Sequence, residues 1–287
     1  IKGYLSRIRR KVTMLAAAVL GSPIDHSLSP LLHESAYRAL GLNDWTYTQI
    51  ECTASDLPRI VSAADPGMRG FSVTRPCKDA ALRFADVVSE RAHIVESANT
   101  LIRRGTEWYA DCTDIDGACA SLKKSGYTGG NVLLLGAGGT SRPYLSALRS
   151  AGVEGVGRVA IASRAEERAQ HTLHVAARLG LDYSWIPLND PEILRASCHN
   201  ATLVISTLPG DAAAGYSTFL RRTPRLIDVT YAPWPTSLAQ VVADNGGTVV
   251  GGRTMLLHQA VAQIEAFTQK TVTDDVFAAM VASLQRS

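Results

Sequence analysis

The stretch "NVLLLGAGG", residues 131–139, constrains the fold of this chain more than any other feature. Its run of Val and Leu predicts a strand buried on both faces, as in parallel sheets covered by helices. The glycines that follow permit a tight turn and let backbone N–H groups approach a pyrophosphate at a helix N-terminus. The stretch therefore predicts a dinucleotide-binding α/β domain. Ser141 stands where the usual G-x-G-x-x-G pattern has its last glycine, so a plain strand-to-helix turn is the competing interpretation.

The end of the next strand indicates which dinucleotide would bind. A site for NAD usually has an acidic residue about 20 or more residues after the glycine turn, where it binds the ribose 2′-hydroxyl. Here the strand "VAIASR" ends in Ser163 and Arg164. The donors of a guanidinium match the oxygens of a 2′-phosphate, so we infer that the cofactor is NADP. In the alternative interpretation Arg164 is an ordinary exposed residue, and Glu166 or Glu167 binds the ribose.

Short apolar strands alternate with helical patterns along the rest of the chain, which predicts layers of helices on sheets. Strands are expected in "AAAVLG", "DWTYTQIEC" and "GFSVT", and two more, joined by a turn near Gly105, in "ANTLIRRGTEWYADCTD". After the glycine turn, "RVAIASR", "YSWIPL", "TLVISTLPG", "RLIDVTYAP" and "GTVVGG" predict further strands. Helices are expected in "SPLLHESAYRALGL", capped by Ser29, in "TDIDGACASLKKSG", capped by Thr113, and in "TMLLHQAVAQIEAFTQ". The helix that begins at Thr113 is expected to cross between two domains.

Charge and apolar runs exclude several classes of function. The formal net charge is +3, but five cations and no acid lie in the first fourteen residues, so the rest of the chain is slightly acidic. A nucleic-acid-binding surface is therefore not expected. Residues 1–13 are interpreted as a basic leader or extension before a natural start at Met14. The leader and "LAAAVLG" together resemble a signal peptide, but the apolar part is better interpreted as a strand. Apolar runs stay well short of the roughly 20 residues that span a bilayer.

The cysteines point to a reducing compartment. The chain has five, which are dispersed and form no CxxC pair, so neither a disulfide framework nor a zinc site is predicted. The histidines also lack the spacing of metal ligands, and no metal is expected. We therefore predict a cytoplasmic protein whose partners are small molecules rather than nucleic acid or membrane. The oligomeric state is left open between monomer and homodimer.

Six short motifs, taken together, carry a resemblance that none carries alone. Taken singly, Lys78 is a solvated lysine at a helix start, Asp114 is an acid favoured at a helix N-terminus, and Asn99 is a turn residue. The motifs "SPIDHSLSP", "SVTRPCK", "SANT", "CTDIDG", "YAPWPT" and "LLHQAVAQ" occur in this order around the dinucleotide fold. The chain, from about residue 16 to its C-terminal helix, thereby resembles the shikimate dehydrogenase family.

The resemblance implies two α/β domains, a substrate domain and a Rossmann-like NADP-binding domain, with the active site in the cleft between them. Residues 14–113 and 256–287 would form the substrate-binding catalytic domain, and residues 114–255 the NADP-binding domain. The implied reaction is the reversible reduction of 3-dehydroshikimate to shikimate with NADPH, a step in aromatic amino-acid (chorismate) biosynthesis. Two alternatives remain: a quinate/shikimate dehydrogenase of broader substrate or NAD use, and a non-catalytic NADP-binding sensor.

The resemblance also implies roles for residues of this chain. Lys78 and Asp114 would be the catalytic pair. The residues that would bind substrate are Ser27 and Ser29 at its carboxylate, Asn99 and Gln259 at its ring hydroxyls, and Thr74 and Tyr231. The residues that would line the cofactor are Gly136, Ala137, Gly138, Gly139, Thr140, Arg142, Ser163 and Arg164. Ser72 and Cys112 depart from the family, which commonly has asparagine at both positions.

Physical chemistry agrees with these roles. Hydride reduction of a ketone develops negative charge on its oxygen, which a lysine ammonium can stabilise and protonate. A carboxylate beside Lys78 would keep the lysine charged and oriented. Pro76 fixes the backbone just before Lys78 and aims the long side chain toward the cleft. Which member of the Lys78–Asp114 pair transfers the proton is left open by the sequence.

Overall fold

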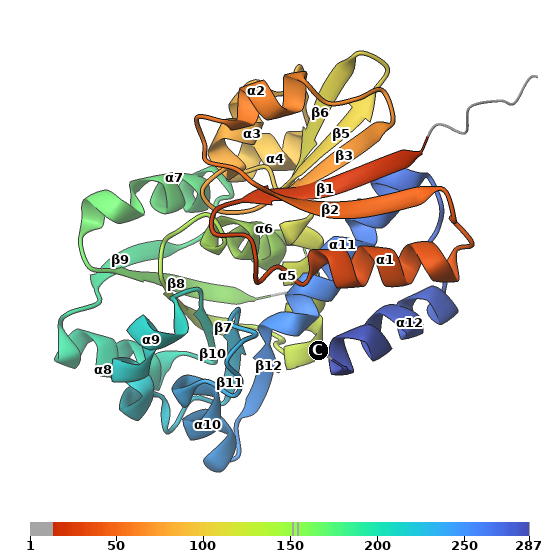
Figure 1. Cartoon of the computed structure of the whole chain (residues 1–287). Helices are drawn as coiled ribbons and strands as arrows, with labels where there is room; N and C mark the ends of the chain where they lie inside the picture. Colours follow the sequence, from red (N-terminus) through yellow and green to blue (C-terminus); the bar gives the residue numbers. More distant parts are fainter. Residues whose placement is uncertain (1–13, 151, 154, 287) are drawn as a thin grey trace, which may run out of the picture.

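A computed structural model of the chain describes residues 14–150, 152–153 and 155–286. The leader predicted at residues 1–13 lies outside this part. Two six-stranded sheets, each flanked by helices, form the molecule (Figure 1). The α/β class predicted from the sequence is confirmed, and so are the two α/β parts that the family resemblance implies.

The first sheet is built from the N-terminal part of the chain. Its strand order is β2-β1-β3-β5-β6-β4. The pairs β3–β5 and β5–β6 are antiparallel, and the pairs β1–β2, β1–β3 and β4–β6 are parallel. The strands are β1 (Leu15–Gly21), β2 (Trp45–Glu51), β3 (Met68–Val73), β4 (Val87–Val88), β5 (Thr100–Arg104) and β6 (Glu107–Asp111). The strand predicted from "AAAVLG" is β1, which lies in the interior of this sheet and is buried from Ala17 onward.

The second sheet is parallel throughout and has the order β12-β11-β10-β7-β8-β9. Its strands are β7 (Gly130–Leu135), β8 (Val156–Ser163), β9 (Tyr183–Pro187), β10 (Leu203–Ser206), β11 (Arg225–Asp228) and β12 (Thr248–Gly251). In chain order this is the doubly wound arrangement 3-2-1-4-5-6, in which strand order reverses between the first and fourth strands. The reversal falls between β7 and β10, so a ligand crevice is expected at their carboxyl ends.

Helices connect and cover the strands. In the first half they are α1 (Ser29–Ala39), α2 (Leu57–Ser62), α3 (Lys78–Phe84), α4 (Glu90–Val95) and α5 (Asp114–Ser125). In the second half they are α6 (Ser141–Ser150), α7 (Gln170–Arg178), α8 (Pro191–Asn200), α9 (Gly210–Ala213), α10 (Ser237–Asp244), α11 (Gly252–Thr268) and α12 (Asp274–Gln285), with 3₁₀ turns at Glu166–Ala169 and Ala214–Leu220.

Two long helices, α5 and α11, pack against each other between the sheets (Figure 1). Their close approach requires Gly117, because a Cβ there would lie 2.5 Å from the carbonyl oxygen of Met255. The helix predicted to cross between domains is α5, and α11 brings the chain back to the first sheet, where α12 packs on α1. These two crossings place residues from the middle and the C-terminal part of the chain beside one cleft.

Apolar clusters lie on the faces of each sheet, and one of them crosses between the halves. Ala92 and Val95 of α4 belong to the same buried cluster as Leu145 and Leu148 of α6. The substrate half therefore packs against the second sheet through α4 as well as through the α5–α11 pair.

One predicted helix cap is wrong, and the other stands at its predicted position without a capping hydrogen bond. Ser29 is the first residue of α1 rather than its cap, and its N–H donates to Ser27 Oγ at 3.3 Å. Thr113 does precede α5, but its hydroxyl bonds to Asn99 and Thr100 instead of to the helix. The hydroxyl of Thr113 is used in a network that Asn99 and Thr100 complete, which the neighbouring sequence alone does not reveal.

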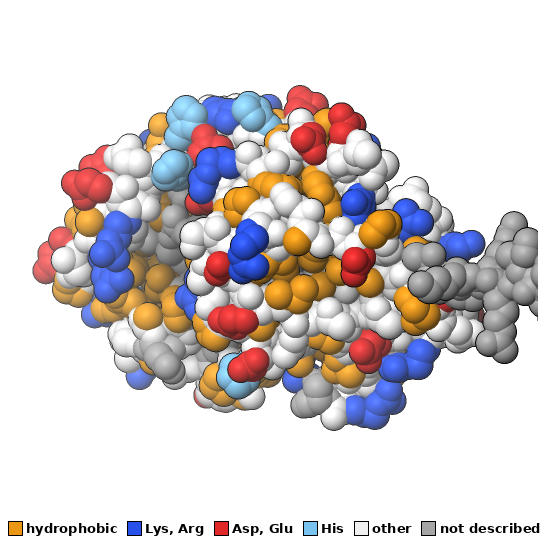
Figure 2. All heavy atoms as spheres, turned by 45° about the horizontal axis from the view of Figure 1, so that its top comes forward, with side chains coloured by type: hydrophobic (Ala, Val, Ile, Leu, Met, Phe, Trp, Pro, Cys, Tyr) orange, Lys and Arg blue, Asp and Glu red, His pale blue; other side chains and the backbone are white. Residues whose placement is uncertain are grey.

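The surface and the helices give two further observations. On the face drawn in Figure 2, Lys and Arg side chains are interspersed with Asp and Glu. None of the helices in residues 14–150, 152–153 and 155–286 combines the length and the apolarity that a membrane span needs.

Candidate active site

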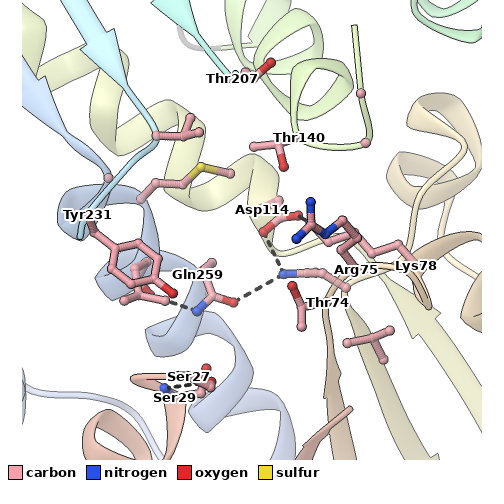
Figure 3. Close-up of a pocket in the computed structure, with 18 of the residues that line it drawn as sticks. Ser27, Ser29, Thr74, Arg75, Lys78, Asp114, Thr140, Thr207, Tyr231 and Gln259 are labelled. Carbon is pink, nitrogen blue, oxygen red and sulfur yellow. Dashed lines mark hydrogen bonds and ion pairs between the residues drawn. The ribbon is translucent and has the colours of Figure 1, made fainter. Parts of the chain in front are cut away.

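A cleft of about 790 Å³ lies between the two sheets. It is bounded by the carboxyl ends of β1 and β3 on one side and by the turns after β7 and β10 on the other, where the strand order predicts a ligand crevice (Figure 3). Its volume falls in the range typical of small-ligand sites. The predicted residues that line it are Ser27, Ser29, Thr74, Lys78, Asn99, Asp114, Gly138, Gly139, Thr140, Arg142, Tyr231 and Gln259. The predicted residues outside this lining are Gly136, Ala137, Ser163 and Arg164.

Lys78 and Asp114 meet in this cleft. Each is the first residue of its helix, α3 and α5 respectively. Lys78 Nζ lies 2.5 Å from Asp114 Oδ2, and the two side chains are only 17% and 8% exposed. A tight turn precedes the lysine, because the N–H of Cys77 donates to the carbonyl of Thr74 at 2.8 Å. An ammonium and a carboxylate far apart in sequence thus form a charge-assisted pair that faces a ligand-sized space.

Asn99 connects this pair to the rest of the substrate side. Its Nδ2 donates to Asp114 Oδ1 at 3.0 Å and to Gln259 Oε1 at 3.3 Å. Its Oδ1 accepts the N–H of Thr113 at 2.7 Å, just before α5 begins. Because Asn99 is 2% exposed, these bonds are shielded from water and fix the carboxylate of Asp114.

A second layer of polar side chains lies behind Asn99, and the sequence analysis missed most of it. Gln263 Nε2 donates to the Asn99 carbonyl at 3.0 Å, and Gln263 Oε1 accepts from Ser72 Oγ at 2.7 Å. Ser72 in turn accepts from Tyr47 OH at 2.7 Å. Burial raises the pKa of Tyr47 above its ordinary value, so it stays a neutral donor. One signal was available, since Gln263 follows Gln259 by four residues and therefore shares its helix face.

Ser27 and Ser29 lie together at the start of α1, where the hydrogen bond between them holds the loop (Figure 3). Two hydroxyls at a helix N-terminus can bind a carboxylate. Tyr231 reaches the same cleft from the segment after β11 and is partly buried, which raises the pKa of its hydroxyl. Hydroxyl donors therefore approach the space from both sheets.

The turn after β7 requires glycine at one position, and at another position a glycine borders open space. Gly136 has φ of +102°, and a Cβ there would lie 2.5 Å from Thr207 Oγ1, so only glycine fits. A Cβ on Gly138 would meet no atom of the described residues within 4 Å. Ser141 closes the turn, since its Oγ donates to the carbonyl of Gly136 at 2.9 Å and lies 2.7 Å from Thr207 Oγ1. The serine that replaces the usual glycine thus supports the turn, and open space remains for a pyrophosphate.

Thr207 was missed by the sequence analysis. It directly follows β10, the strand beside β7, and it lines the cleft. Its position at the strand-order reversal was the signal that could have identified it.

Ser163 is the last residue of β8, and Arg164 follows it. Strand β8 pairs with β7, the strand that leads into the glycine turn. Ser163 Oγ donates to the carbonyl of Ala165 at 2.6 Å and accepts from Trp185 Nε1 at 2.9 Å. Because these bonds occupy the serine hydroxyl, it holds the strand end together. Arg164 is exposed, which leaves its guanidinium available for a phosphate.

The cysteines near the site are packing residues. Cys112 is fully buried two residues before Asp114, and burial raises the pKa of its thiol above the usual range. Burial likewise raises the pKa of Cys77 to about 12, and its Sγ donates to the carbonyl of Cys52 at 3.0 Å. Neither thiol is a nucleophile at neutral pH. No cluster of three His, Cys, Asp or Glu side chains suited to a metal occurs in the described ranges.

A doubly wound parallel sheet with a glycine turn, facing a lysine–carboxylate pair across a ligand-sized cleft, defines a two-domain dinucleotide-dependent oxidoreductase. Comparison with known proteins identifies the family. Residues 19–101 match the model of the shikimate dehydrogenase substrate binding domain. The chain belongs to the shikimate dehydrogenase family.

Relatives and solved structures agree on this membership. The chain is 30% identical to a protein of Syntrophobacter fumaroxidans named shikimate dehydrogenase (NADP(+)), over 90% of this chain and 88% of the relative. It is 32% identical to one of the same name from Methylobacterium radiotolerans, over 88% and 90%. The crystal structure of Mycobacterium tuberculosis shikimate dehydrogenase is 43% identical, with a TM-score of 0.86 over 94% of this chain and 99% of that one. A Thermus thermophilus shikimate 5-dehydrogenase, in complex with NADP(H) and shikimate, is 28% identical, with a TM-score of 0.76 over 94% and 100%.

Proposed function

We propose that this protein is an NADP-dependent shikimate dehydrogenase, which reduces 3-dehydroshikimate to shikimate with NADPH and catalyses the reverse reaction. The reaction would serve chorismate and aromatic amino-acid biosynthesis. The observation that carries the proposal is the 2.5 Å contact of Lys78 with Asp114 inside the cleft that the glycine turn borders. A sensor protein would not need this proton-transfer pair, which disfavours the non-catalytic alternative.

The residues of the cofactor side fit NADP. The open space at Gly138, the hydrogen-bonded turn behind it and the N-terminus of α6 form an anion cradle for a pyrophosphate. The exposed Arg164 at the end of β8 would bind the 2′-phosphate. NADPH, when bound, supplies the hydride that reduces the substrate ketone.

The chain's own residues would do the rest of the chemistry. In the reduction, the Lys78 ammonium would stabilise the negative charge that develops on the ketone oxygen, and the Lys78–Asp114 pair would deliver the proton that makes it an alcohol. In the oxidation, the pair would accept that proton. Asp114 orients the side chain of Lys78, and Asn99 holds the carboxylate of Asp114.

Substrate binding would use the hydroxyls and amides around this pair. The Ser27 and Ser29 hydroxyls would hold the substrate carboxylate at the start of α1. Asn99 and Gln259 would bind ring hydroxyls, and Thr74 and Tyr231 would contact the ring from opposite sides of the cleft. These groups lie on a ligand-sized space, which supports the assignment.

We further propose the division of the chain and its location. The substrate domain would comprise residues 14–113 and 256–287, and the NADP-binding domain residues 114–255. Dispersed free cysteines, most of them buried, fit a reducing cytoplasm. Light scattering of the purified protein would decide between a monomer and a homodimer.

The experiment that tests the function is the oxidation of NADPH, followed by absorbance, in the presence of 3-dehydroshikimate. We expect turnover with NADPH far above that with NADH. Failure to oxidise either cofactor would contradict the proposal. Assaying quinate against shikimate with NADP⁺ and NAD⁺ tests the alternative of a broader quinate/shikimate dehydrogenase, because quinate's extra hydroxyl must fit beside Ser27 and Ser29. Equal rates with both acids would favour that alternative.

A further inference from the structure

Arg142 reaches from the cofactor half of the cleft into the substrate half. It is the second residue of α6, just after the glycine turn, and its side chain is only 7% exposed. Its Nη1 donates to the carbonyl oxygen of Glu96 at 2.7 Å, and its Nη2 donates to Asp79 Oδ1 at 3.2 Å. Both acceptors belong to the part of the chain that builds the first sheet. A nearly buried cation is therefore satisfied across the cleft rather than within its own domain.

The two segments that Arg142 contacts are the ones that carry site residues. Asp79 directly follows Lys78 at the start of α3. Glu96 lies three residues before Asn99, which bonds to the carboxylate of Asp114. The two segments also touch each other, since the N–H of Ala98 donates to the carbonyl of Lys78 at 3.4 Å. One guanidinium thus links the start of α3 to the loop that carries Asn99.

Glu96 is held in place from a second side. Its φ of +51° is uncommon for a residue other than glycine, so surrounding contacts must maintain it. Side chains of α7 surround its carboxylate: His171 Nδ1 at 3.0 Å, His174 Nε2 at 3.6 Å and Arg178 Nη1 at 3.7 Å. The carbonyl that Arg142 contacts therefore belongs to a residue that the cofactor half fixes through two helices, α6 and α7.

The glycine turn lies against both Arg142 and the catalytic lysine. A Cβ built on Gly139 would be 3.7 Å from Arg142 Nη2 and 4.0 Å from Lys78 Cδ. The guanidinium, the stem of the lysine and the turn that would hold the cofactor are therefore packed together. Two of the five N–H donors of Arg142, one on each terminal nitrogen, already serve the substrate half in this arrangement, so fewer remain for a phosphate.

We propose that Arg142 is a positioning residue, which sets Lys78 and Asn99 relative to the glycine turn, rather than a ligand of a cofactor phosphate. This role replaces the cofactor-lining role that the family resemblance implied for it, and it rests on the proposed function. The reacting groups on the two halves must meet in one geometry. A misplacement of about 1 Å between such groups can cost about 10²-fold in rate.

Kinetics of Arg142→Gln test the proposal. We expect kcat to fall about 10–100-fold, on the scale that misplacement costs, while KM for NADPH changes by less than about threefold, which is under 1 kcal/mol. The deuterium isotope effect on kcat, measured with NADPH deuterated at the transferred position, should rise because hydride transfer becomes slower. Arg142→Lys, which keeps the charge, should recover part of the lost rate. Arg149→Gln, an exposed arginine on the same helix, is the matched control and should behave as wild type.

Two kinetic outcomes would overturn the proposal. A large rise in KM for NADPH with kcat retained would make Arg142 a phosphate ligand. A loss of activity with an unchanged isotope effect, in proportion to the unfolded fraction seen by circular dichroism, would make its role merely structural.

A second measurement does not depend on activity. Hydrogen exchange of the backbone amides of residues 78–80 and 96–99 should quicken in Arg142→Gln and not in Arg149→Gln, because the bonds that fix these segments are lost. Unchanged exchange would contradict the proposed contact whatever the kinetics. If the wild-type protein did not oxidise NADPH with 3-dehydroshikimate, the proposed function would fail, and the exchange result would still decide whether Arg142 holds these segments.

Discussion

The two sides of the cleft present their polar groups in opposite ways. On the substrate side, buried side chains from distant segments bond to one another, as Asn99 does to Asp114 and Gln259. On the cofactor side, the backbone forms the site, and Gly138 borders open space. A small ring with several hydroxyls needs donors and acceptors in fixed directions, whereas a pyrophosphate is bound by any well-placed set of backbone N–H groups. Changes in the substrate-side network should therefore alter several bonded residues at once, whereas changes in the glycine turn or at Arg164 should stay local.

The largest effect should come from removing the lysine of the substrate side. Lys78→Ala should lower kcat by roughly 10²–10⁴, the scale of general acid–base catalysis, because the proton-transfer pair is broken and the developing charge on the ketone oxygen loses the ammonium beside it. Substrate should still bind, which equilibrium titration with shikimate would check. Lys123→Ala, at an exposed position of α5, is the control. Near-normal turnover in Lys78→Ala would remove this lysine from the mechanism.

The second largest effect should come from the layer behind Asn99. Gln263→Leu would leave Ser72 Oγ and the carbonyl of Asn99 without the partners they have now. We expect a loss of about 3 kcal/mol in the free energy of unfolding, since buried polar groups lose their bonds. Urea denaturation measures it, with Gln170→Leu, at an exposed helical position, as the control. Equal stability of the two variants would mean that the network contributes little.

On the cofactor side, Arg164→Ala should weaken NADPH binding and leave NADH binding nearly unchanged. Losing charge-assisted bonds to the 2′-phosphate should cost about 2 kcal/mol, or roughly 30-fold in Kd. Fluorescence titration with each cofactor measures the difference. Arg158→Ala, at the opposite end of the same strand, should alter neither affinity. Equal losses for NADPH and NADH in Arg164→Ala would refute the 2′-phosphate assignment.

The smallest effect on stability should come from Gly138→Ala. Its Cβ would enter open space, so the free energy of unfolding should stay within about 0.5 kcal/mol of wild type. Cofactor affinity should nevertheless fall, because the methyl group occupies the space that a pyrophosphate needs. Gly136→Ala is the contrasting variant, since its positive φ and its contact with Thr207 should make it less stable. Thermal unfolding of both, with and without NADPH, makes the comparison. If Gly138→Ala bound NADPH as wild type does, the cradle would lie elsewhere.

The sequence predicted the cofactor side in greater detail than the substrate side. The apolar run of β7, the turn at Gly136 and the exposed strand end at Arg164 all lie within residues 130–164, so periodicity and spacing identify them. Lys78 and Asp114 came from the resemblance carried by six motifs, because a lone lysine or acid at a helix start has ordinary interpretations. The cleft that brings the two together was not visible in either motif by itself.

What the sequence missed depends on contacts between distant segments. The bonds of Gln263 to Ser72 and Asn99 join residues 191 and 164 positions apart. Ser29 was expected to cap a helix because it suits that role locally, whereas the role of Arg142 came from the family resemblance, which says nothing of its contacts in the other half. The structure instead places Ser29 inside its helix and gives Arg142 partners in the other half of the molecule.

By itself the amino-acid sequence determined the strands, the glycine turn, the class of the fold and the kinds of side chain available for chemistry. These follow from local periodicity and from the backbone freedom of single residues. The tertiary structure alone decided which of those side chains meet, because α5 and α11 cross between the two sheets and bring Asp114 and Gln259 to the cleft that Lys78 borders. Hydrogen bonds and ion pairs act over a few ångströms of space, whatever the separation along the chain.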